Sequence, residues 1–245
     1  MLLGGCTEPR DRCSYTAWTD YRGVALSRLP DGSAYLFQTA HKSYDADGAP
    51  DAYHPDGTGL DDNRNAGWPG TNWWPAVLVP DPANPSVPYV QPDGPFAGYF
   101  VARTTLTDSS RPDTDPAKYV DATTVPYLVF PGAFFGMSGT GRYGDLGVAF
   151  NRATGQSSPF VVADQGPTSA PLGEMSLALA NALGGRDVDP RSGAGGPEGE
   201  ILYVVFPNSV ERRATPWPLD AAALDARSRA LLAGAGGEAP ALACR

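Results

Sequence analysis

Two carboxylates ten positions apart, Asp164 and Glu174, are the residues of this chain whose types and spacing most directly suggest chemistry. Asp164 closes a short apolar run at 160–163, and Gly166-Pro167 breaks the chain directly after it. A chain that turns at this point can bring both carboxylates to one cleft. Paired carboxylates in a cleft are the groups that hydrolyse glycosides, one as general acid and the other as general base or nucleophile.

Segment 160–185, FVVADQGPTSAPLGEMSLALANALGG, must supply the elements that position these two side chains. Its first four residues are apolar and favour a strand. Pro171 suits the first position of a helix, and residues of helical spacing follow it before a Gly-Gly stop, namely Leu172, Met175, Leu179 and Leu183. We therefore expect Asp164 at the end of a strand and Glu174 in the first turn of a helix.

The same positions also have a purely structural interpretation. An Asp at the end of a strand is a common turn former, and a Glu in a first helical turn interacts favourably with the helix dipole. A short motif without its structural context matches by chance often. The local pattern alone leaves both interpretations open.

A second group of carboxylates lies in segment 44–70, YDADGAPDAYHPDGTGLDDNRNAGWPG, whose Asp, Gly, Pro and Asn content predicts a long ordered loop. Asp45-x-Asp47-Gly48 is similar to the start of a calcium loop. The position where an EF-hand carries Glu is Asp56 here, and no helical flanks are expected. We interpret these carboxylates as loop-forming or sugar-binding, with calcium as the minor alternative.

Aromatic residues follow the acidic loop in Asn72-Trp73-Trp74-Pro75. Trp73 and Trp74 could form a platform on which a sugar ring stacks. The alternative is that each Trp packs into the core of the loop region, as large aromatic side chains commonly do.

Composition predicts a mainly β protein with a few helices and long loops. The 245 residues contain 29 Gly and 25 Pro, while 42% hydrophobic against 18% charged residues allow a sizeable core. We expect about six strands, of which five outside the segment above lie at 33–40, 96–104, 126–130, 146–151 and 200–206. An amphipathic helix is expected at 219–232, and no stretch resembles a free linker, so one domain is the economical interpretation.

Charge and residue usage exclude several function classes. The formal net charge of −9 argues against a nucleic-acid partner and would suit a cationic substrate, although exported proteins are often acidic for solubility. His41 and His54 have no metal-site spacing around them and no serine partner for a triad, so neither receives a catalytic role. We expect no metal, no cofactor and no transmembrane segment.

The first residues resemble the end of a bacterial lipoprotein signal, because Leu3-Gly4-Gly5-Cys6 is similar to a lipobox; chance is the alternative. The chain would then be secreted or held at the cell surface by a lipid anchor at Cys6, with 1–32 as an export or anchor remnant and lead-in. If Cys6 is lipidated or otherwise unpaired, cysteine arithmetic in an exported chain predicts a disulfide between Cys13 and Cys244.

Several motifs together resemble the fungal-type chitosanases, glycoside hydrolase family 75. They occur in the family's order across roughly residues 35–235, at 44–70, 72–80, 125–132 (VPYLVFPG), 139–147 (GTGRYGDLG) and VADQGP…LGEMSLALANALGG. The resemblance implies a secreted endo-chitosanase, with 33–245 as its catalytic domain, a six-stranded double-psi-like β-barrel as its core and a monomeric state.

The resemblance also implies the reaction and its residues. The enzyme would cleave β-1,4 links between glucosamine units with inversion, using Asp164 of the ADxGP motif and Glu174 of the LGE motif. We expect Glu174 to be the general acid, because the apolar run at 171–173 would raise its pKa, and Asp164 to be the general base. A helix N-terminus would oppose the shift at Glu174, and the reverse assignment of acid and base within the pair is the alternative.

Chitosan is the polysaccharide partner that the resemblance implies, and acidic side chains should bind its protonated amines. The candidate substrate contacts are Asp45, Asp47, Asp51, Asp145, Trp73 and Trp74, and each Asp suits a structural turn equally well. Two alternatives stay open: a hydrolase of another amino-sugar polymer such as partly deacetylated peptidoglycan, or a non-catalytic polysaccharide-binding barrel.

Overall fold

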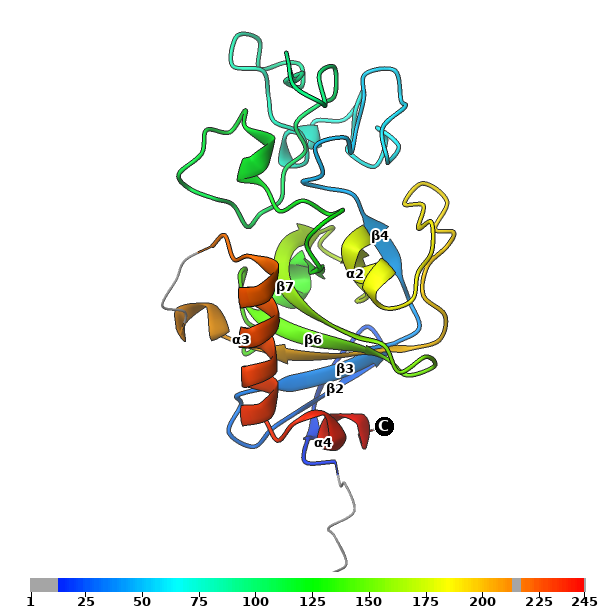
Figure 1. The fold of residues 1–245 in the computed structure, drawn as a ribbon, viewed down its shortest axis with the longest axis vertical. Coiled ribbons are helices and arrows are strands. Elements are labelled where there is room, and N and C mark those ends of the chain that lie inside the picture. The colour runs from blue at the N-terminus through cyan, green and yellow to red at the C-terminus, as the bar shows by residue number, and fades with distance from the viewer. Residues whose placement is uncertain (1–12, 213–216, 245) are drawn as a thin grey trace, which may run out of the picture.

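A computed structural model describes residues 13–212 and 217–244. Its strands form one mixed sheet in the order β1-β2-β3-β9-β6-β7-β5-β8-β4 (Figure 1). The strands are β1 (Thr16–Tyr21), β2 (Val24–Arg28), β3 (Tyr35–Thr39), β4 (Ser43–Asp45), β5 (Tyr127–Pro131), β6 (Leu146–Asn151), β7 (Ser157–Gly166), β8 (Glu174–Ser176) and β9 (Ile201–Phe206). The helices are α1 (Gly132–Phe135), α2 (Leu177–Ala182), α3 (Ala221–Gly234) and α4 (Glu238–Leu242), and the 3-10 turns are η1 (Trp74–Ala76), η2 (Pro116–Lys118) and η3 (Ser209–Arg212).

The sheet confirms the prediction of a mainly β protein with a few helices, but not the closed six-stranded barrel. Nine described strands pair in an open order, with β1 and β4 at the two ends. Neighbours are antiparallel except for β5 with β7 and β4 with β8, which are parallel. The parallel pairs lie at the β4 end of the sheet, where the candidate site forms.

The hairpin of β1 and β2 was not predicted, and it lies within the segment interpreted as a lead-in. Arg22 and Gly23 both have positive φ and connect Tyr21 directly to Val24, as a tight two-residue hairpin turn requires. Strand β1 is at the edge of the sheet and β2 lies next to it, and both include polar residues, so the sequence gives a weak strand signal. The predicted boundary at residue 32 therefore falls inside the sheet.

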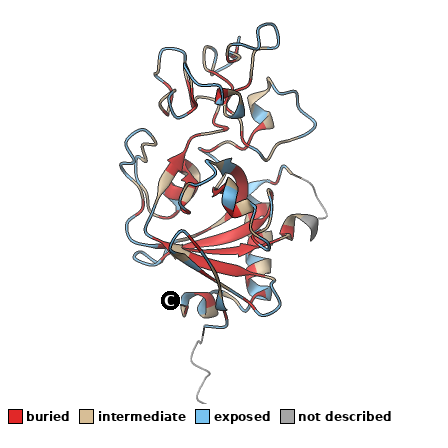
Figure 2. Ribbon diagram, turned by 180° about the vertical axis from the view of Figure 1, so that it is seen from behind, coloured by how far each residue is buried: buried red, intermediate tan, exposed pale blue. Residues whose placement is uncertain are grey.

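The core lies around the central strands, whose sequences are continuous apolar runs. Every residue of β5, β6 and β9 is buried (Figure 2). Strands buried on both faces read as unbroken apolar runs, which explains why the sequence predicted these three. Helix α3 packs against β6 and β7 (Figure 1).

A disulfide joins Cys13, just before β1, to Cys244, just after α4, with 4.7 Å between the two Cα atoms. The predicted pairing is confirmed. A structural disulfide is typical of an oxidising, extracellular-type environment. The lipidation prediction at Cys6 lies outside the described residues, and among those described no helix has the length and apolar character to cross a bilayer.

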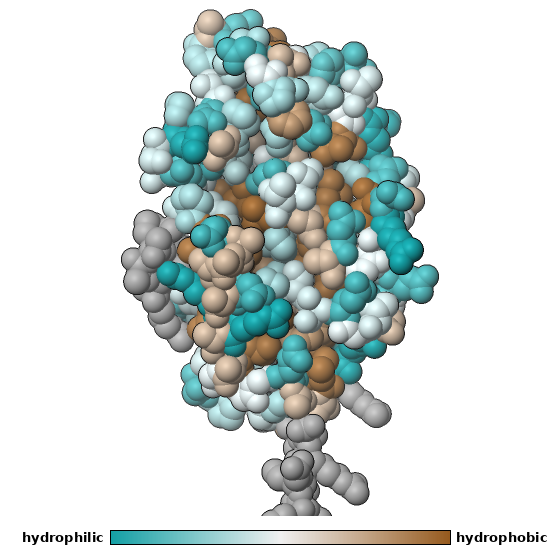
Figure 3. Space-filling view, in the orientation of Figure 1, coloured by the Kyte–Doolittle hydropathy of each residue, from teal (hydrophilic) through white to brown (hydrophobic). Residues whose placement is uncertain are grey.

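Residues 46–126 form a loop region beyond the β4 end of the sheet, with only short 3-10 turns and isolated bridges (Figure 1). The acidic loop predicted at 44–70 is part of it. Hydrophilic and apolar residues lie side by side on the face of this region that Figure 3 shows. The strand predicted at 96–104 is wrong: Phe100 and Ala102 make only single bridges, to Val90 and Leu78. Gly98 has a positive φ within this stretch, which prevents a continuous extended ladder.

The helix predicted to begin at Pro171 is also wrong, since Glu174 begins strand β8 and helix α2 starts only at Leu177. Gly173 has φ +119°, and a Cβ there would lie 2.2 Å from the carbonyl oxygen of His41, so the chain packs tightly beside β4. Ser176 then caps α2 by accepting a hydrogen bond from the Leu179 amide over 3.1 Å.

Candidate active site

The candidate active site forms where four neighbouring strands bring acidic side chains together. Glu174 of β8 pairs with Ser43 of β4, and Asp164 of β7 pairs with Val129 of β5. Met175 of β8 in turn pairs with Leu128 of β5. The sheet therefore places Asp164, Glu174 and the β4 terminus, with Asp45, within four consecutive strands, β7-β5-β8-β4.

A bulge in β7 sets the position of Asp164. Leu128 pairs with Val162 and the next residue, Val129, pairs with Asp164, so Ala163 is an extra residue in the strand. The Ala163 carbonyl accepts a hydrogen bond from the Leu106 amide of the loop region over 2.8 Å. Bulges redirect side chains near functional sites, and here the bulge immediately precedes the carboxylate. Asp164 thus lies inside β7, which continues to Gly166, and not at a strand end as predicted.

One oxygen of Asp164 receives three hydrogen bonds. Its Oδ1 accepts from the Thr105 amide at 2.9 Å, the Thr105 hydroxyl at 2.7 Å and the Gln165 amide at 2.7 Å. These donors favour the ionised form of the carboxyl group. They also fix its orientation, which leaves Oδ2 as the oxygen with capacity for a further partner.

Burial raises the pKa of both central carboxyl groups. The pKa of Asp164 rises to about 6, against the opposing effect of the Thr105 and Gln165 donors and of the Arg103 charge. For Glu174, burial and then the charges of Asp164 and Asp61 raise the pKa from 4.5 to about 7. The two groups are therefore ordered as a general acid and a general base require near neutral pH, with Glu174 holding its proton more tightly.

Glu174 lies directly against strand β7. A Cβ placed on Gly166 would be 2.7 Å from Oε2 of Glu174, so the glycine leaves the space that this carboxylate occupies. Gly166 follows Asp164 by two residues, and side chains two apart lie on the same face of a strand. This close approach, with the charge interaction between the two groups, places both carboxylates at one location.

Asp45 and Asp47 complete the acidic group. Burial raises the pKa of Asp45 well above its usual value, and Asp164 and Glu174 add to the effect; burial and the Asp45 charge act similarly on Asp47. The Tyr53 hydroxyl donates to Oδ1 of Asp47 over 2.8 Å, and the Tyr127 hydroxyl donates to its backbone carbonyl over 3.0 Å. Two buried tyrosines thus hold Asp47 in position, one through its carboxylate and the other through its backbone carbonyl.

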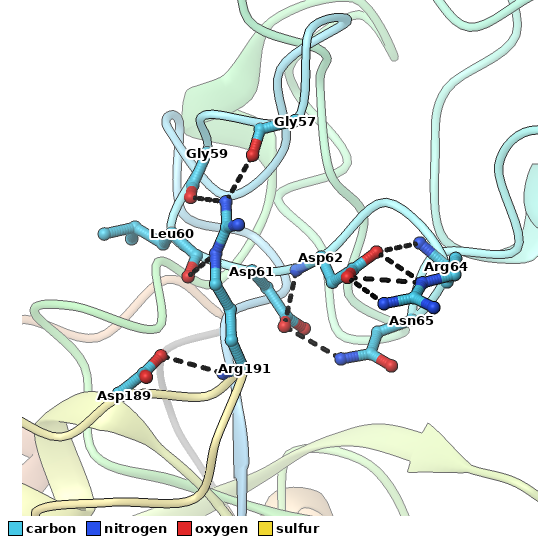
Figure 4. A network of polar contacts seen from close by, with 9 residues as sticks. All are labelled: Gly57, Gly59, Leu60, Asp61, Asp62, Arg64, Asn65, Asp189 and Arg191. Atoms are coloured by element: carbon cyan, nitrogen blue, oxygen red, sulfur yellow. Dashed lines mark hydrogen bonds and ion pairs between the residues drawn. The ribbon is translucent and has the colours of Figure 1, made fainter.

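A polar network holds the acidic loop in place from a different segment (Figure 4). Arg191, in the connection between α2 and β9, directs its guanidinium at backbone carbonyls of the loop: that of Gly57 at 2.7 Å, that of Leu60 at 3.2 Å, and that of Gly59. Asp61, in the same loop, accepts from the Asp62 amide at 2.7 Å and from Asn65 at 2.8 Å. Arg191 therefore ties the loop that carries Asp61 to the rest of the fold.

Three of these carboxylates could also ligate a cation. Oxygens of Asp45, Asp47 and Asp164 all lie within 4.8 Å of one another, and carboxylate oxygens are the ligands that hard divalent cations prefer. Internal donors already satisfy part of this set, because Oδ1 of Asp164 has three of them and Oδ1 of Asp45 accepts from the Asp47 amide at 2.8 Å. The arrangement is equally suited to an ammonium group.

The other predicted contacts, Asp51 and Asp145, can now be compared with their two interpretations, a substrate contact or a structural role. Asp51 is partly buried, and its pKa is raised by burial and by the charge of Asp121, which is not part of the acidic group. Asp145 is fully buried and accepts from the backbone amides of Arg142, Asn208 and Val210 at 2.7 to 3.0 Å. Asp145 thus holds two loops together and is too enclosed to contact a polymer, contrary to the expected substrate contact.

The two tryptophans also differ. Trp74 is buried and packs edge-on against Trp68, which in turn contacts Phe100. Trp73 is 46% exposed, on the other hand, and precedes the short turn η1. Trp74 is therefore a core residue of the loop region, and only Trp73 presents a surface that a sugar could stack on.

Sequence reasoning did not identify four residues that contact or polarise the acidic group: Thr105, Arg103, Tyr53 and Tyr127. Tyr127 lies in the VPYLVFPG run and Tyr53 in the acidic loop, so both were in segments already singled out. Arg103 lies near the end of the stretch that was wrongly predicted as a strand, and Thr105 comes directly after that stretch. Nothing in their local sequence signals a contact with a residue 59 positions away.

Two cavities border the loop region. The larger, about 670 Å³, is mainly apolar and includes Tyr89, Phe96 and Trp217 in its wall. The smaller, about 460 Å³, is polar, and its wall includes Thr105, the residue bonded to Asp164. Larger cavities are the usual default for a site, but the smaller one is connected to Asp164 through its wall residue Thr105 and is the better candidate for binding near the acidic group.

Comparison with models of known protein families and with curated proteins finds no match for this chain.

Proposed function

We propose that this protein is an inverting glycoside hydrolase that cleaves β-1,4 links between glucosamine units of chitosan. The observation that carries the proposal is the pair Asp164, which is buried on β7, and Glu174, which is half-buried on β8, two strands that flank β5. Their carboxyl groups meet at one location and have pKa values raised to about 6 and about 7. Carboxyl groups ordered in this way supply the general base and general acid of glycoside hydrolysis.

In the proposed reaction Glu174 donates its proton to the glycosidic oxygen, and the bond from that oxygen to the anomeric carbon breaks. Asp164 accepts a proton from the water whose oxygen forms the new bond at the opposite face of the sugar. The three donors to Oδ1 of Asp164 favour its ionised state, so Oδ2 would accept the proton from water. Both carboxyl groups return to their starting states when the products leave and protons exchange with solvent.

Asp45 and Asp47 support a cationic substrate in preference to a neutral one. A glucosamine ammonium approaching this group would gain from several carboxylates in a poorly solvated site, where charge interactions are strong. The net charge of −9 favours approach of a polycation over longer distances. Another amino-sugar polymer such as partly deacetylated peptidoglycan would exploit the same chemistry and is the second candidate substrate.

The finer features that accompany this function are also proposals. They are a six-stranded double-psi-like arrangement as the core of the sheet, action outside the cell, a lipid anchor at Cys6 and a monomeric state. The disulfide between Cys13 and Cys244 supports an extracellular setting.

Release of new reducing ends from chitosan, peptidoglycan and cellulose tests the proposal. We expect release from chitosan, with a smaller or no release from cellulose, which has no amine for the acidic group to bind. Release from peptidoglycan alone would favour the second substrate. Binding to any of these polymers without release would favour a non-catalytic binding barrel.

A further inference from the structure

The polar cavity that has Thr105 in its wall differs in charge from the acidic group to which Thr105 is bonded. The side chains that distinguish its wall are Arg103, Thr104, Thr105, Thr107, Asp113 and Lys118, and its volume is about 460 Å³. Two cations against one carboxylate give this wall an excess of positive charge. A cavity built only to receive glucosamine would be expected to have the opposite sign.

Contacts through Thr105 connect this cavity to the reacting group. Thr105 is exposed at the cavity wall, while its amide and hydroxyl both bond to Oδ1 of Asp164. A sugar seated in the cavity would therefore lie against a residue that is bonded directly to the proposed general base.

The two cations are held in place by the surrounding loops. One guanidinium nitrogen of Arg103 donates to the Pro75 carbonyl over 2.9 Å. The ammonium of Lys118, whose side chain is 14% exposed, donates to the Arg111 carbonyl over 2.8 Å and pairs with Asp113 at 3.1 Å. Because both groups are fixed, they cannot swing out into solvent to relieve repulsion with an incoming ammonium group.

We propose that this cavity is a subsite for a sugar whose 2-substituent carries no positive charge, which in an amino-sugar polymer is N-acetylglucosamine. An ammonium group beside two fixed cations is disfavoured, whereas the acetamide carbonyl can accept hydrogen bonds from such donors. This inference rests on the proposed function. The protein would then be selective for the acetylation pattern of its substrate, because the polar cavity disfavours glucosamine and the acidic group binds it.

The test measures binding, so that it does not depend on turnover. The Glu174→Gln variant is titrated calorimetrically at low salt with glucosamine tetramers, one fully deacetylated and the others carrying a single N-acetyl group at each defined position. We expect at least one singly acetylated isomer to bind about tenfold more tightly than the fully deacetylated tetramer. A fully deacetylated tetramer that binds as tightly as every isomer would overturn the subsite.

Variants at Lys118 assign the effect to the cavity. Adding Lys118→Gln should reduce the preference about threefold, since one of the two fixed cations is removed. Lys118→Arg should retain it, as should Arg229→Gln, which changes an exposed cation of α3. A preference that is the same in the Lys118→Gln and Arg229→Gln proteins would contradict the role of the cavity. Absence of hydrolysis in the wild-type protein would instead count against the proposed function.

Discussion

The hydroxyl and the backbone amide of Thr105 both donate to Oδ1 of Asp164, at 2.7 and 2.9 Å, across 59 residues of sequence. A loop residue thus supplies two of the three donors that hold the proposed base. Residue 105 also lies at the wall of the polar cavity. The loop region therefore influences both the ionisation and the orientation of the Asp164 carboxylate.

Replacing Thr105 with Val removes the hydroxyl donor and keeps the β-branched shape and the backbone amide. The pKa of Asp164 should rise, so the low-pH limb of the activity profile should move to higher pH and kcat/KM below that limb should fall. Loss of a hydrogen bond to a charged group corresponds to about tenfold or more in rate. Thr105→Ser should restore the profile, and a Thr105→Val profile identical to wild type would contradict this role.

The pH dependence of kcat/KM should be bell-shaped and narrow. Asp164 must be ionised to act as base and Glu174 protonated to act as acid, so activity should rise near pH 6 and fall near pH 7. The two limbs belong to the interacting pair and not to either residue alone. An activity that is still rising above pH 9 would be incompatible with Glu174 as the acid.

Stability should increase when the acid is made neutral. The pKa of Glu174 is raised on folding, so its contribution to stability is fully present below pH 4.5 and is lost as pH rises through about 7. Above that pH the ionised carboxylate costs up to about 3 kcal/mol. Glu174→Gln should therefore raise the melting temperature at pH 8 and have little effect at pH 4.

The control for this measurement is Glu198→Gln, which neutralises an exposed Glu. It should leave the melting temperature nearly unchanged at both pH values, because an exposed carboxylate stays solvated in the folded protein. If Glu174→Gln lowers the melting temperature at pH 8, the ionised carboxylate stabilises the fold, and the inference that its burial is unfavourable is wrong.

The two adjacent tryptophans should respond differently to truncation. Trp74→Ala removes a buried ring that packs on Trp68 and should destabilise the protein by about 3–5 kcal/mol. Trp73→Ala, at a 46% exposed position, should leave the melting temperature within a degree or two and raise KM for polymer more than it lowers kcat. An unchanged KM in the folded Trp73→Ala protein would remove Trp73 from substrate binding.

Local pattern predicted the parts of the fold that are locally encoded. Strands β5, β6 and β9 are unbroken apolar runs, and the β3, α3 and acidic-loop segments were also found near their observed positions. The Cys13–Cys244 pairing followed from the cysteine count once Cys6 was set aside as a lipobox residue. The same segment 160–185 correctly joined Asp164 and Glu174 at one location, although through a bulged strand and a second strand instead of a strand and a helix.

The errors have tertiary causes. Residues 172–183 have helical spacing, but parallel pairing of β8 with β4 and the tight approach of Gly173 to His41 override it for the first few residues. Asp145 appeared as accessible as any loop carboxylate, and only the fold shows the three amides that enclose it. Thr105 donates to Asp164 only because the fold brings its loop against β7, and no local sequence pattern indicates that contact.

The central claim is that Asp164 and Glu174 are the base and acid of one hydrolytic reaction. Its most direct test compares the initial rate of reducing-end release from chitosan by the wild-type, Asp164→Asn and Glu174→Gln proteins at pH 6.5, each checked for folding by its melting curve. We predict that each variant folds and that its kcat is lower by a factor on the order of 10² or more, as loss of a general acid or base requires. Near-normal turnover by either folded variant would contradict the account.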